Sequence, residues 1–499
     1  MHWTNDGLWF QGDAPRHAAS GLFAWDLLHS LPTDPIGFTL SYYARYPIIT
    51  PGAYPPLFYL LEGLAFSLTA PSPHVAKVLV LGFSIVAAMY TMMYGRRWIS
   101  PAAGWAGACL VLAPGYALFS NTVLLNIPAT ALGLGALYHF RAWLDTSTTS
   151  QRNLFVGLTA GMLLTYYHAV VVVVPVLIAW MYLDARPYRL RALLLTTIAA
   201  IVLIALMGLT MPSYVTRHVL PIERFFAPWR WLALIQNHSS LTGVRWLVLG
   251  MCGILIGFVR TSRRKESLRL ALAVALIGAA ASVTVEDPRY GLMLMPITIL
   301  AAFLGIVGVS ELWKRAPSMV SATAVVVALG VAAPNAAARF PIVSGFETVA
   351  AFLRQQGAKD AVLYAGQYDG VFGFYLRASD PMLEQRLVLY RKLLESRPSG
   401  RTTPADVVTL IQSRCGCQWV AIEVAEGDRS GPSMSALRGA LVGPEFELVS
   451  SFSVEAFEVQ RVELYRVTMA VEPIRAFDLT FPLFSDRVFR NVSPIDSRR

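Results

Sequence analysis

Charged residues are scarce in this chain: they make up 14% of its 499 residues, whereas soluble globular proteins average about 25%. Hydrophobic residues account for 55% of the sequence, and the mean hydropathy is +0.51. Because long apolar runs take the place of the missing charge, the composition excludes an ordinary soluble enzyme. It predicts a protein that crosses a membrane several times.

Cysteine is also rare, and four residues do not make a disulfide framework. Cys109 and Cys252 lie in apolar runs, where they are expected to be packing residues. Cys415 and Cys417 form a C-G-C sequence in the tail. A disulfide between them requires an oxidising compartment, and because so short a loop is strained we expect two free thiols.

Runs that combine basic and aromatic residues, as nucleic-acid binding requires, are missing as well. The pI of 9.5 is explained instead by arginines and lysines that fall on alternate sides of the apolar segments. Five short connections, together roughly 40 residues long, hold fourteen of these residues: Arg96 and Arg97; Arg141 and Arg152; Arg186, Arg189 and Arg191; Arg260, Arg263, Arg264, Lys265 and Arg269; Lys314 and Arg315.

The intervening connections, roughly 50 residues in all, hold few basic residues: Arg217, Arg224, Arg230 and Arg289. Because positively charged loops remain in the cytoplasm, the first set of connections is predicted to be cytoplasmic and the second extracytoplasmic. The chain is therefore predicted to be a multi-pass plasma (inner) membrane protein. Its chemistry is expected outside, because the second set also carries most of the conspicuous His, Trp, Asn and acidic residues.

Ten segments are predicted to span the membrane, each near the ~20 residues that a helix needs. Residues 122–140 form one span, which is expected to be broken near its start by Pro128. Residues 153–183 are too many for one helix, so we expect two short helices that meet at 166–168. The other seven spans are uninterrupted runs: 75–95, 101–119, 190–211, 244–260, 267–285, 290–310 and 317–334.

The first 74 residues are predicted to form an extracytoplasmic loop. Residues 57–70 are too short to cross the bilayer and are expected to lie against its outer surface as an interfacial helix. Residues 1–13 contain no apolar core that would make a signal peptide. We therefore expect a first transmembrane helix encoded upstream, with export by the downstream helices as the alternative.

The predicted fold is a polytopic α-helical membrane module over 75–335, followed by an extracytoplasmic α/β or α+β domain over 336–499. The pattern of residues 346–356 in this domain is typical of a helix. An irregular tail is expected after 470. Four segments are predicted to be strands: 361–365, 419–424, 446–452 and 462–467.

Asp13 directly precedes an amphipathic stretch, and its carboxylate has two interpretations. With Pro15 in the first turn it could be a helix cap, which the local sequence favours. It could instead be a general base on a loop near the membrane surface. Arg16 and His17 beside it are suited to binding a phosphate, or they are surface charges.

A second candidate is the short loop that contains Glu286, Asp287, Arg289 and Tyr290. An arginine on the outer side has no anchoring role, so a phosphate or carboxylate partner is expected for Arg289. His168, at the junction of the two short helices, is a polar residue at membrane depth. Such residues are usually functional or well paired.

An ordered series of segments resembles the GT-C superfamily of membrane glycosyltransferases, specifically the protein O-mannosyltransferase and aminoarabinose-transferase-like branch. The resemblance covers about residues 1–335. The segments that carry it are Asp13 in the first loop, Y-P-P-L-F-Y-L-L at 54–61, R-R at 96–97, S-N-T-V-L-L-N-I-P-A at 120–129, V-G-L-T-A-G-M-L-L-T-Y-Y-H at 156–168 and R-Y-G-L-M-L-M-P at 289–296.

This resemblance implies that Asp13 is the catalytic acid/base, that the donor is a sugar on a polyprenyl phosphate, and that transfer inverts the anomeric centre. The chain departs from the family at two positions. Asn126 stands where the family usually has Asp, and His168 where it often has Lys. Because an amide cannot act as a base, either Asp13 suffices or the activity differs.

The sequence therefore predicts a glycosyltransferase that uses a polyprenyl-phosphate sugar and an unknown hydroxyl acceptor. Arg289, Tyr290, Arg16 and His168 are predicted to bind the donor phosphate, and Asn126, Glu286, Asp287 and His17 to support the site or the acceptor. No cofactor is required by this scheme, although Asp13, His17 and Glu62 could meet as ligands of a divalent metal. The alternatives are a transporter or lipid flippase, which usually shows repeated broken helices, and an inactive scaffold that lost an acid at Asn126.

Overall fold

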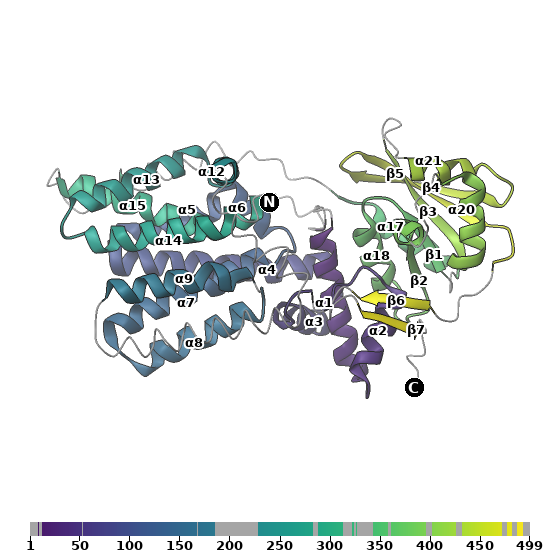
Figure 1. Cartoon of the computed structure of the whole chain (residues 1–499), viewed down its shortest axis with the longest axis horizontal. Helices are drawn as coiled ribbons and strands as arrows, with labels where there is room; N and C mark the ends of the chain where they lie inside the picture. The colour runs from purple at the N-terminus through teal and green to yellow at the C-terminus, as the bar shows by residue number, and fades with distance from the viewer. Residues whose placement is uncertain are drawn as a thin grey trace.

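The computed structural model describes residues 8, 12–51, 53–166, 168–184, 228–282, 288–312, 322–323, 326, 343–357, 361–395, 402–425, 432–471, 477–481 and 487–492. Figure 1 shows a bundle of helices, an α/β domain, and a layer of first-loop helices between them. The predicted spans 190–211 and 317–334 fall wholly or largely outside the described residues.

Three helices form the intermediate layer: α1 (Asp13–Ser30), α2 (Pro35–Arg45) and α3 (Leu57–Leu68). Helix α1 runs across the end of the bundle (Figure 1). Helix α3 has 12 residues, or about 18 Å, which is too short to cross a bilayer, as predicted. Its backbone joins it to the bundle, because Leu57 N–H donates to the carbonyl of Leu164 at 2.9 Å.

The bundle consists of α4 (Pro73–Tyr94), α5 (Ala106–Leu112), α6 (Pro114–Ser120), α7 (Asn126–Thr146), α8 (Thr149–Leu163), α9 (His168–Leu183), α12 (Pro228–Thr242), α13 (Val244–Val259), α14 (Arg264–Ser282) and α15 (Leu294–Leu312). By length and hydropathy, two described segments can each cross a membrane, Pro73–Ile99 and Leu294–Glu311. Two bent helix pairs would raise the number to four. The count of ten spans therefore remains a prediction.

Two of the predicted helix boundaries are wrong. Residues 101–119 were expected to form one span, but α5 and α6 meet there at an angle of 62°. Pro114 is the cause, because a proline disfavours the helical conformation of the residue before it, and Ala113 is extended at ψ 132°. Conversely, Pro128 does not break α7. It lies in the first turn of the helix, where its missing N–H is not needed.

The interpretation of residues 153–183 as two short helices is confirmed. Helix α8 ends at Leu163 and α9 begins at His168. The junction lies beside the first loop, since the ring of Tyr166 stacks on that of Tyr54 with 6.1 Å between centroids.

Small residues bring α13 and α15 into close contact. A Cβ atom on Gly305 would lie 2.5 Å from the Cα of Gly253, and one on Gly253 would overlap the carbonyl of Ala301. Close approach at small residues is a common way to pack membrane helices, because lipid offers no hydrophobic drive for their association.

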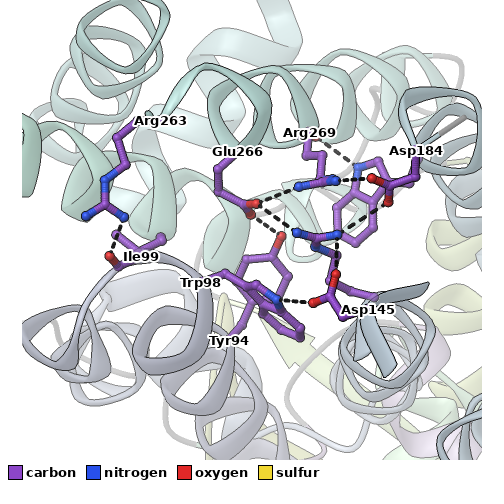
Figure 2. Close-up of polar contacts among 10 residues, drawn as sticks. Tyr94, Trp98, Ile99, Asp145, Asp184, Arg263, Glu266 and Arg269 are labelled. Carbon is purple, nitrogen blue, oxygen red and sulfur yellow. Dashed lines mark hydrogen bonds and ion pairs between the residues drawn. The ribbon is translucent and has the colours of Figure 1, made fainter. Parts of the chain in front are cut away.

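Buried ion pairs tie together the end of the bundle that carries the arginine-rich connections (Figure 2). Arg269 reaches Asp184 at 2.6 Å and Glu266 at 3.1 Å. Arg141 reaches Asp145 at 2.9 Å and Asp184 at 3.3 Å. The network joins α7 and α14 through Asp184, the residue that follows α9, and its charges are paired, as burial requires.

The ends of α4 and α15 join the same region. Tyr94 donates to Glu266 at 2.5 Å, and Trp98 donates to Asp145 at 2.7 Å. Arg263 bonds to the carbonyl of Ile99 at 2.7 Å and to Glu311 at 2.6 Å. The described parts of the connections predicted to be cytoplasmic therefore lie at one end of the bundle, opposite the first loop.

The C-terminal domain is built on a five-stranded sheet of order β2-β1-β3-β5-β4. Strand β1 is parallel to β2 and β3, and β5 is antiparallel to β3 and β4. The strands are β1 (Ala361–Ala365), β2 (Arg386–Leu389), β3 (Cys417–Ala425), β4 (Phe446–Ala456) and β5 (Val459–Val467). Its helices are α17 (Phe346–Gln355), α18 (Asp369–Ala378), α19 (Tyr390–Glu395), α20 (Pro404–Leu410) and α21 (Pro432–Leu441).

The four predicted strands and the predicted helix of this domain are confirmed, but two expectations are wrong. In the described residues after 470 the structure is not irregular, because β6 (Phe477–Phe481) and β7 (Arg487–Val492) pair in antiparallel orientation. Cys415 and Cys417 form a disulfide, with 5.0 Å between their Cα atoms, rather than two free thiols. The strain argument failed because Gly416 between them adopts a left-handed conformation at φ 58°.

The topology can be tested with single cysteines at exposed positions on either side, after Cys252 is replaced by alanine. Thr261→Cys, at the arginine-rich end, is expected to resist a membrane-impermeant maleimide in intact cells and to react after permeabilisation. Ser451→Cys, in β4, is expected to react in intact cells. Labelling of position 261 from outside would contradict the scheme.

Candidate active site

The first turn of α1 presents Asp13 without using it as a cap. The N-cap position is Gly12, at φ 90°, and no side chain caps this helix. Asp13 is the first helical residue, and its carboxylate is directed elsewhere. The helix-cap interpretation is therefore wrong, because glycine occupies the position from which a side chain could cap.

The carboxylate of Asp13 forms an ion pair with Arg289, with 2.6 Å between Oδ2 and Nη2. Arg289 lies in the 3₁₀-helix η4 (Pro288–Gly291), which leads into α15. Its side chain is 12% exposed, whereas that of Asp13 is 32% exposed. Two residues that the sequence singled out, 276 positions apart, thus meet at the seam between first loop and bundle.

Two further sequence candidates lie around Arg289. The amide of Asn126, at the start of α7, donates to the Arg289 carbonyl at 3.5 Å. The ring of Tyr290 lies 5.4 Å from the Arg289 guanidinium carbon. Asn126 therefore contacts the backbone that presents the arginine, which an amide can do although it cannot accept a proton as a base.

His17, one turn after Asp13, is buried and shares a hydrogen bond of 2.7 Å with the hydroxyl of Tyr59. Burial lowers the pKa of His17 to about 4. The imidazole is therefore neutral near pH 7 and does not supply a positive charge for a phosphate. The imidazole also meets the ring of Tyr54 edge-on, with 4.9 Å between centroids. Together with the bond to Tyr59, this contact makes His17 a packing residue between α1 and α3.

Arg16 points toward the C-terminal domain. Its Nη2 lies 3.8 Å from Oδ2 of Asp369, the first residue of α18, and its side chain is 19% exposed. The side chains of His168, Glu286 and Asp287 lie outside the described residues.

Glu62 of α3 is fully buried, and neither carboxyl oxygen has a hydrogen-bond partner. Its carboxyl group packs on Gly21 of α1, where a Cβ atom would overlap it. Burial raises the pKa of Glu62 well above its usual value. The side chain is therefore expected to be neutral near pH 7, since an unpaired buried carboxylate is costly.

In the part of the chain that the structure describes, no three His, Cys, Asp or Glu residues are placed to hold a metal ion. Asp13, His17 and Glu62, which the sequence left open as ligands, therefore do not converge. Asp13 faces Arg289, and His17 faces Tyr59.

Sequence reasoning missed Tyr59 and Asp369. Tyr59 lies in an apolar segment that was interpreted only as an interfacial helix, and a tyrosine there gives no separate signal. Asp369 is far from the first loop along the chain, and no local pattern links them. Only the packing of α18 on α1 brings it to the site.

No protein-family model and no curated protein matches this chain. Among solved structures, it is similar to ArnT from Cupriavidus metallidurans in the apo state, at 15% identity and a TM-score of 0.55. That alignment covers 94% of this chain and 96% of ArnT.

The chain is also similar to the archaeal oligosaccharyltransferase AglB from Archaeoglobus fulgidus, in complex with an inhibitory peptide and a dolichol-phosphate. The identity is 13% and the TM-score 0.56, over 83% of this chain and 66% of AglB. Both proteins are GT-C glycosyltransferases, so the chain has the GT-C fold that its sequence resemblance predicted.

The neutral state of Glu62 makes a prediction about stability. A carboxyl group whose pKa is higher in the folded than in the unfolded protein stabilises the fold at low pH, and this contribution is lost as the pH rises. The usual pKa of Glu is about 4.5. As the pH rises above this value, the native protein is therefore expected to become less stable relative to Glu62→Gln, whose side chain does not titrate.

Thermal unfolding followed between pH 5 and pH 8 would test this. The unfolding temperature of Glu62→Gln relative to the native protein is expected to rise with pH by a few °C, since 1 kcal/mol corresponds to about 2–4 °C in larger domains. Glu447→Gln, on an exposed strand position, is the control. A constant difference across this pH range would show that Glu62 is not held neutral.

Proposed function

Because the chain has the GT-C fold, we propose that it is a membrane glycosyltransferase that transfers a sugar from a polyprenyl-phosphate donor to an acceptor hydroxyl. The observation that carries the proposal is the ion pair between Asp13 and Arg289. It brings a partly exposed carboxylate of the first loop together with a guanidinium of the bundle, a group suited to binding phosphate. A lipid-linked donor is supported by the dolichol-phosphate in the AglB complex.

Asp13 is the base in this mechanism. Its carboxylate accepts the proton of the acceptor hydroxyl while the hydroxyl oxygen attacks C1 of the sugar. The bond between C1 and the phosphate oxygen breaks, and the phosphate leaves with the electron pair. A single displacement of this kind inverts the anomeric centre.

Arg289 stabilises the leaving group, because negative charge develops on the phosphate as the bond breaks. A guanidinium has five donors in a planar fork and matches phosphate oxygens bidentately. In the structure the guanidinium of Arg289 is paired with Asp13. Donor phosphate competes for the same group, so binding of the donor partly releases the carboxylate for its role as base.

The other candidates have supporting roles in this proposal. Asn126 bonds to the backbone of Arg289 and holds η4. Tyr290 lies against the Arg289 guanidinium. Arg16 adds positive charge on the first turn of α1, and His168 opens α9 beside the first loop.

We propose residues 1–74 and 336–499 as extracytoplasmic parts and 75–335 as the module in the inner membrane, with no cofactor required.

The proposed reaction can be tested with purified protein in nanodiscs and a panel of polyprenyl-phosphate sugars with candidate acceptors. Asp13→Asn is expected to lower the rate of polyprenyl-phosphate release by roughly 10²–10⁴-fold, the usual contribution of a general base. Asp34→Asn is the matched control, since Asp34 caps α2 in the same loop and Asn caps nearly as well.

Full turnover in Asp13→Asn would exclude Asp13 as the base. Movement of the donor lipid between leaflets without release of polyprenyl phosphate would instead favour the flippase alternative.

Arg289→Lys tests the leaving-group site. Lysine keeps the charge but loses the planar fork, so donor binding is expected to weaken by about 1.5–3 kcal/mol, the value of a charged hydrogen bond. The affinity for polyprenyl phosphate, measured by titration in nanodiscs, should fall roughly 10- to 150-fold. Arg152→Lys, at the far end of the bundle, is the control. An unchanged affinity in the folded variant would exclude Arg289 from the phosphate site.

A further inference from the structure

Helix α18 of the C-terminal domain lies along α1, the helix that begins with Asp13 (Figure 1). The two helices touch near both of their ends. Gly370 packs on Pro15 at the N-terminal ends, and Arg377 pairs with Asp26 farther along. The C-terminal domain is therefore fixed directly to the element that carries the proposed base.

The contact at the N-terminal ends is close and leaves no room for a side chain. A Cβ atom on Gly370 would lie 2.8 Å from Cγ and 2.9 Å from Cβ of Pro15, and 3.8 Å from the backbone nitrogen of Arg16. Pro15 and Arg16 follow Asp13 by two and three residues. The backbone of α18 thus rests on the first turn of α1.

Asp369 adds an electrostatic contact to the same turn. Its Oδ2 lies 2.7 Å from Arg391 and 3.8 Å from Arg16, and its side chain is only 8% exposed. The carboxylate stands between an arginine of the C-terminal domain and one of the first loop. Because it is largely buried, it is screened less than a surface ion pair.

The segment that precedes α18 is itself held from the sheet. The carboxylate of Glu423, in β3, accepts hydrogen bonds from the backbone N–H groups of Gln367 and Tyr368, both at 2.7 Å, and from the hydroxyl of Tyr364. Gly366 lies against the same carboxylate, which leaves no space for a Cβ atom. The start of α18 is therefore positioned by the core of its own domain.

Farther along α18, a second group of contacts, around Asp26, holds the helix against α1. Arg377 donates through Nε and Nη2 to the two oxygens of Asp26, and Tyr42 donates to the same carboxylate at 2.8 Å. Asp380, just after α18, accepts from Tyr46 at 2.6 Å. All of these groups are buried, so separation of the two domains would leave charges unpaired.

From this geometry we propose that Asp369 and Gly370 are positioning residues for the transfer reaction. They hold the first turn of α1 so that Asp13 stays opposite Arg289. The inference rests on the proposed function, in which Asp13 is the base, and it makes the C-terminal domain part of the active site. It assigns no contact between Asp369 or Gly370 and a substrate.

Gly370→Ala tests the proposal, because its methyl group forces α18 away from Pro15 and changes no charge. Gly439→Ala is a matched control in the same domain, since its Cβ would lie 2.9 Å from Cγ of Pro404, far from α1. Both variants are made in the full chain and compared in nanodiscs. Equal unfolding temperatures show that any difference between them is local.

The first measurement is amide hydrogen exchange and needs no activity. Exchange in the first two turns of α1 is expected to be at least about tenfold faster in Gly370→Ala than in Gly439→Ala. The reason is that α18 no longer packs closely on these turns, so they open locally more often. Equal exchange in the two variants would overturn the proposal. This outcome is independent of whether the protein transfers sugar.

The second measurement is steady-state kinetics with the donor. Gly370→Ala is expected to lower kcat at least about tenfold, because a misplacement on the order of 1 Å can cost 10²-fold. The KM for the donor should stay within about twofold of native, because Arg289 remains in η4. Faster exchange without a change in kcat would overturn the positioning role and leave the contact merely structural.

Two substitutions of Asp369 test its electrostatic contact, because one removes the carboxylate and the other keeps it. Asp369→Asn should lower kcat, and Asp369→Glu should restore most of it, since a carboxylate on a longer stem still reaches between two arginines. Equal kcat in the Asn and Glu variants would exclude the electrostatic part of the proposal. If the native protein transfers no sugar, the proposed function fails, and the exchange result alone decides whether α18 holds α1.

Discussion

Buried charges have to be paired, and this constraint fixes both ends of the helical bundle. At the arginine-rich end, Arg141 and Arg269 both pair with Asp184, and each has a second partner, Asp145 for Arg141 and Glu266 for Arg269. At the opposite end, Asp13 of the first loop pairs with Arg289. In the buried pairs at the arginine-rich end, removing one partner leaves an uncompensated charge, which costs about 3–5 kcal/mol. Between the two ends, helices pack through small and apolar side chains, as α13 and α15 do at Gly253 and Gly305.

The same constraint explains why α1 is an integral part of the architecture. One face of the helix meets the bundle through Asp13, and another meets the C-terminal domain through Asp26 and Arg377. Its interior face covers Glu62, a buried side chain whose carboxyl group packs on Gly21. A helix that is fixed on three sides can present a carboxylate at a defined position, which a mobile loop cannot do.

Much of this arrangement could be predicted from the sequence, because the signals were local. The alternation of basic connections and the apolar runs indicated the membrane module, and period-two patterns gave four strands of the C-terminal domain. Arg289 was found because a basic residue without an anchoring role is out of place on the outer side, and Asp13 because its carboxylate directly precedes an amphipathic stretch in a segment that resembles the GT-C first loop. The helix-cap interpretation of Asp13 failed because Gly12 occupies the cap position. The contacts of Asp369 and Arg377 join residues more than 350 positions apart, and no local pattern encodes them.

In the proposed mechanism, Arg289 binds the donor phosphate beside Asp13. The most direct test is an electron cryomicroscopy structure of the full chain in nanodiscs with polyprenyl phosphate. A phosphate is expected within hydrogen-bond distance of the Arg289 guanidinium, at about 2.7–2.9 Å, with the Asp13 carboxylate adjacent and facing the position of the acceptor. A phosphate bound elsewhere, with the ion pair between Asp13 and Arg289 unchanged, would contradict this mechanism.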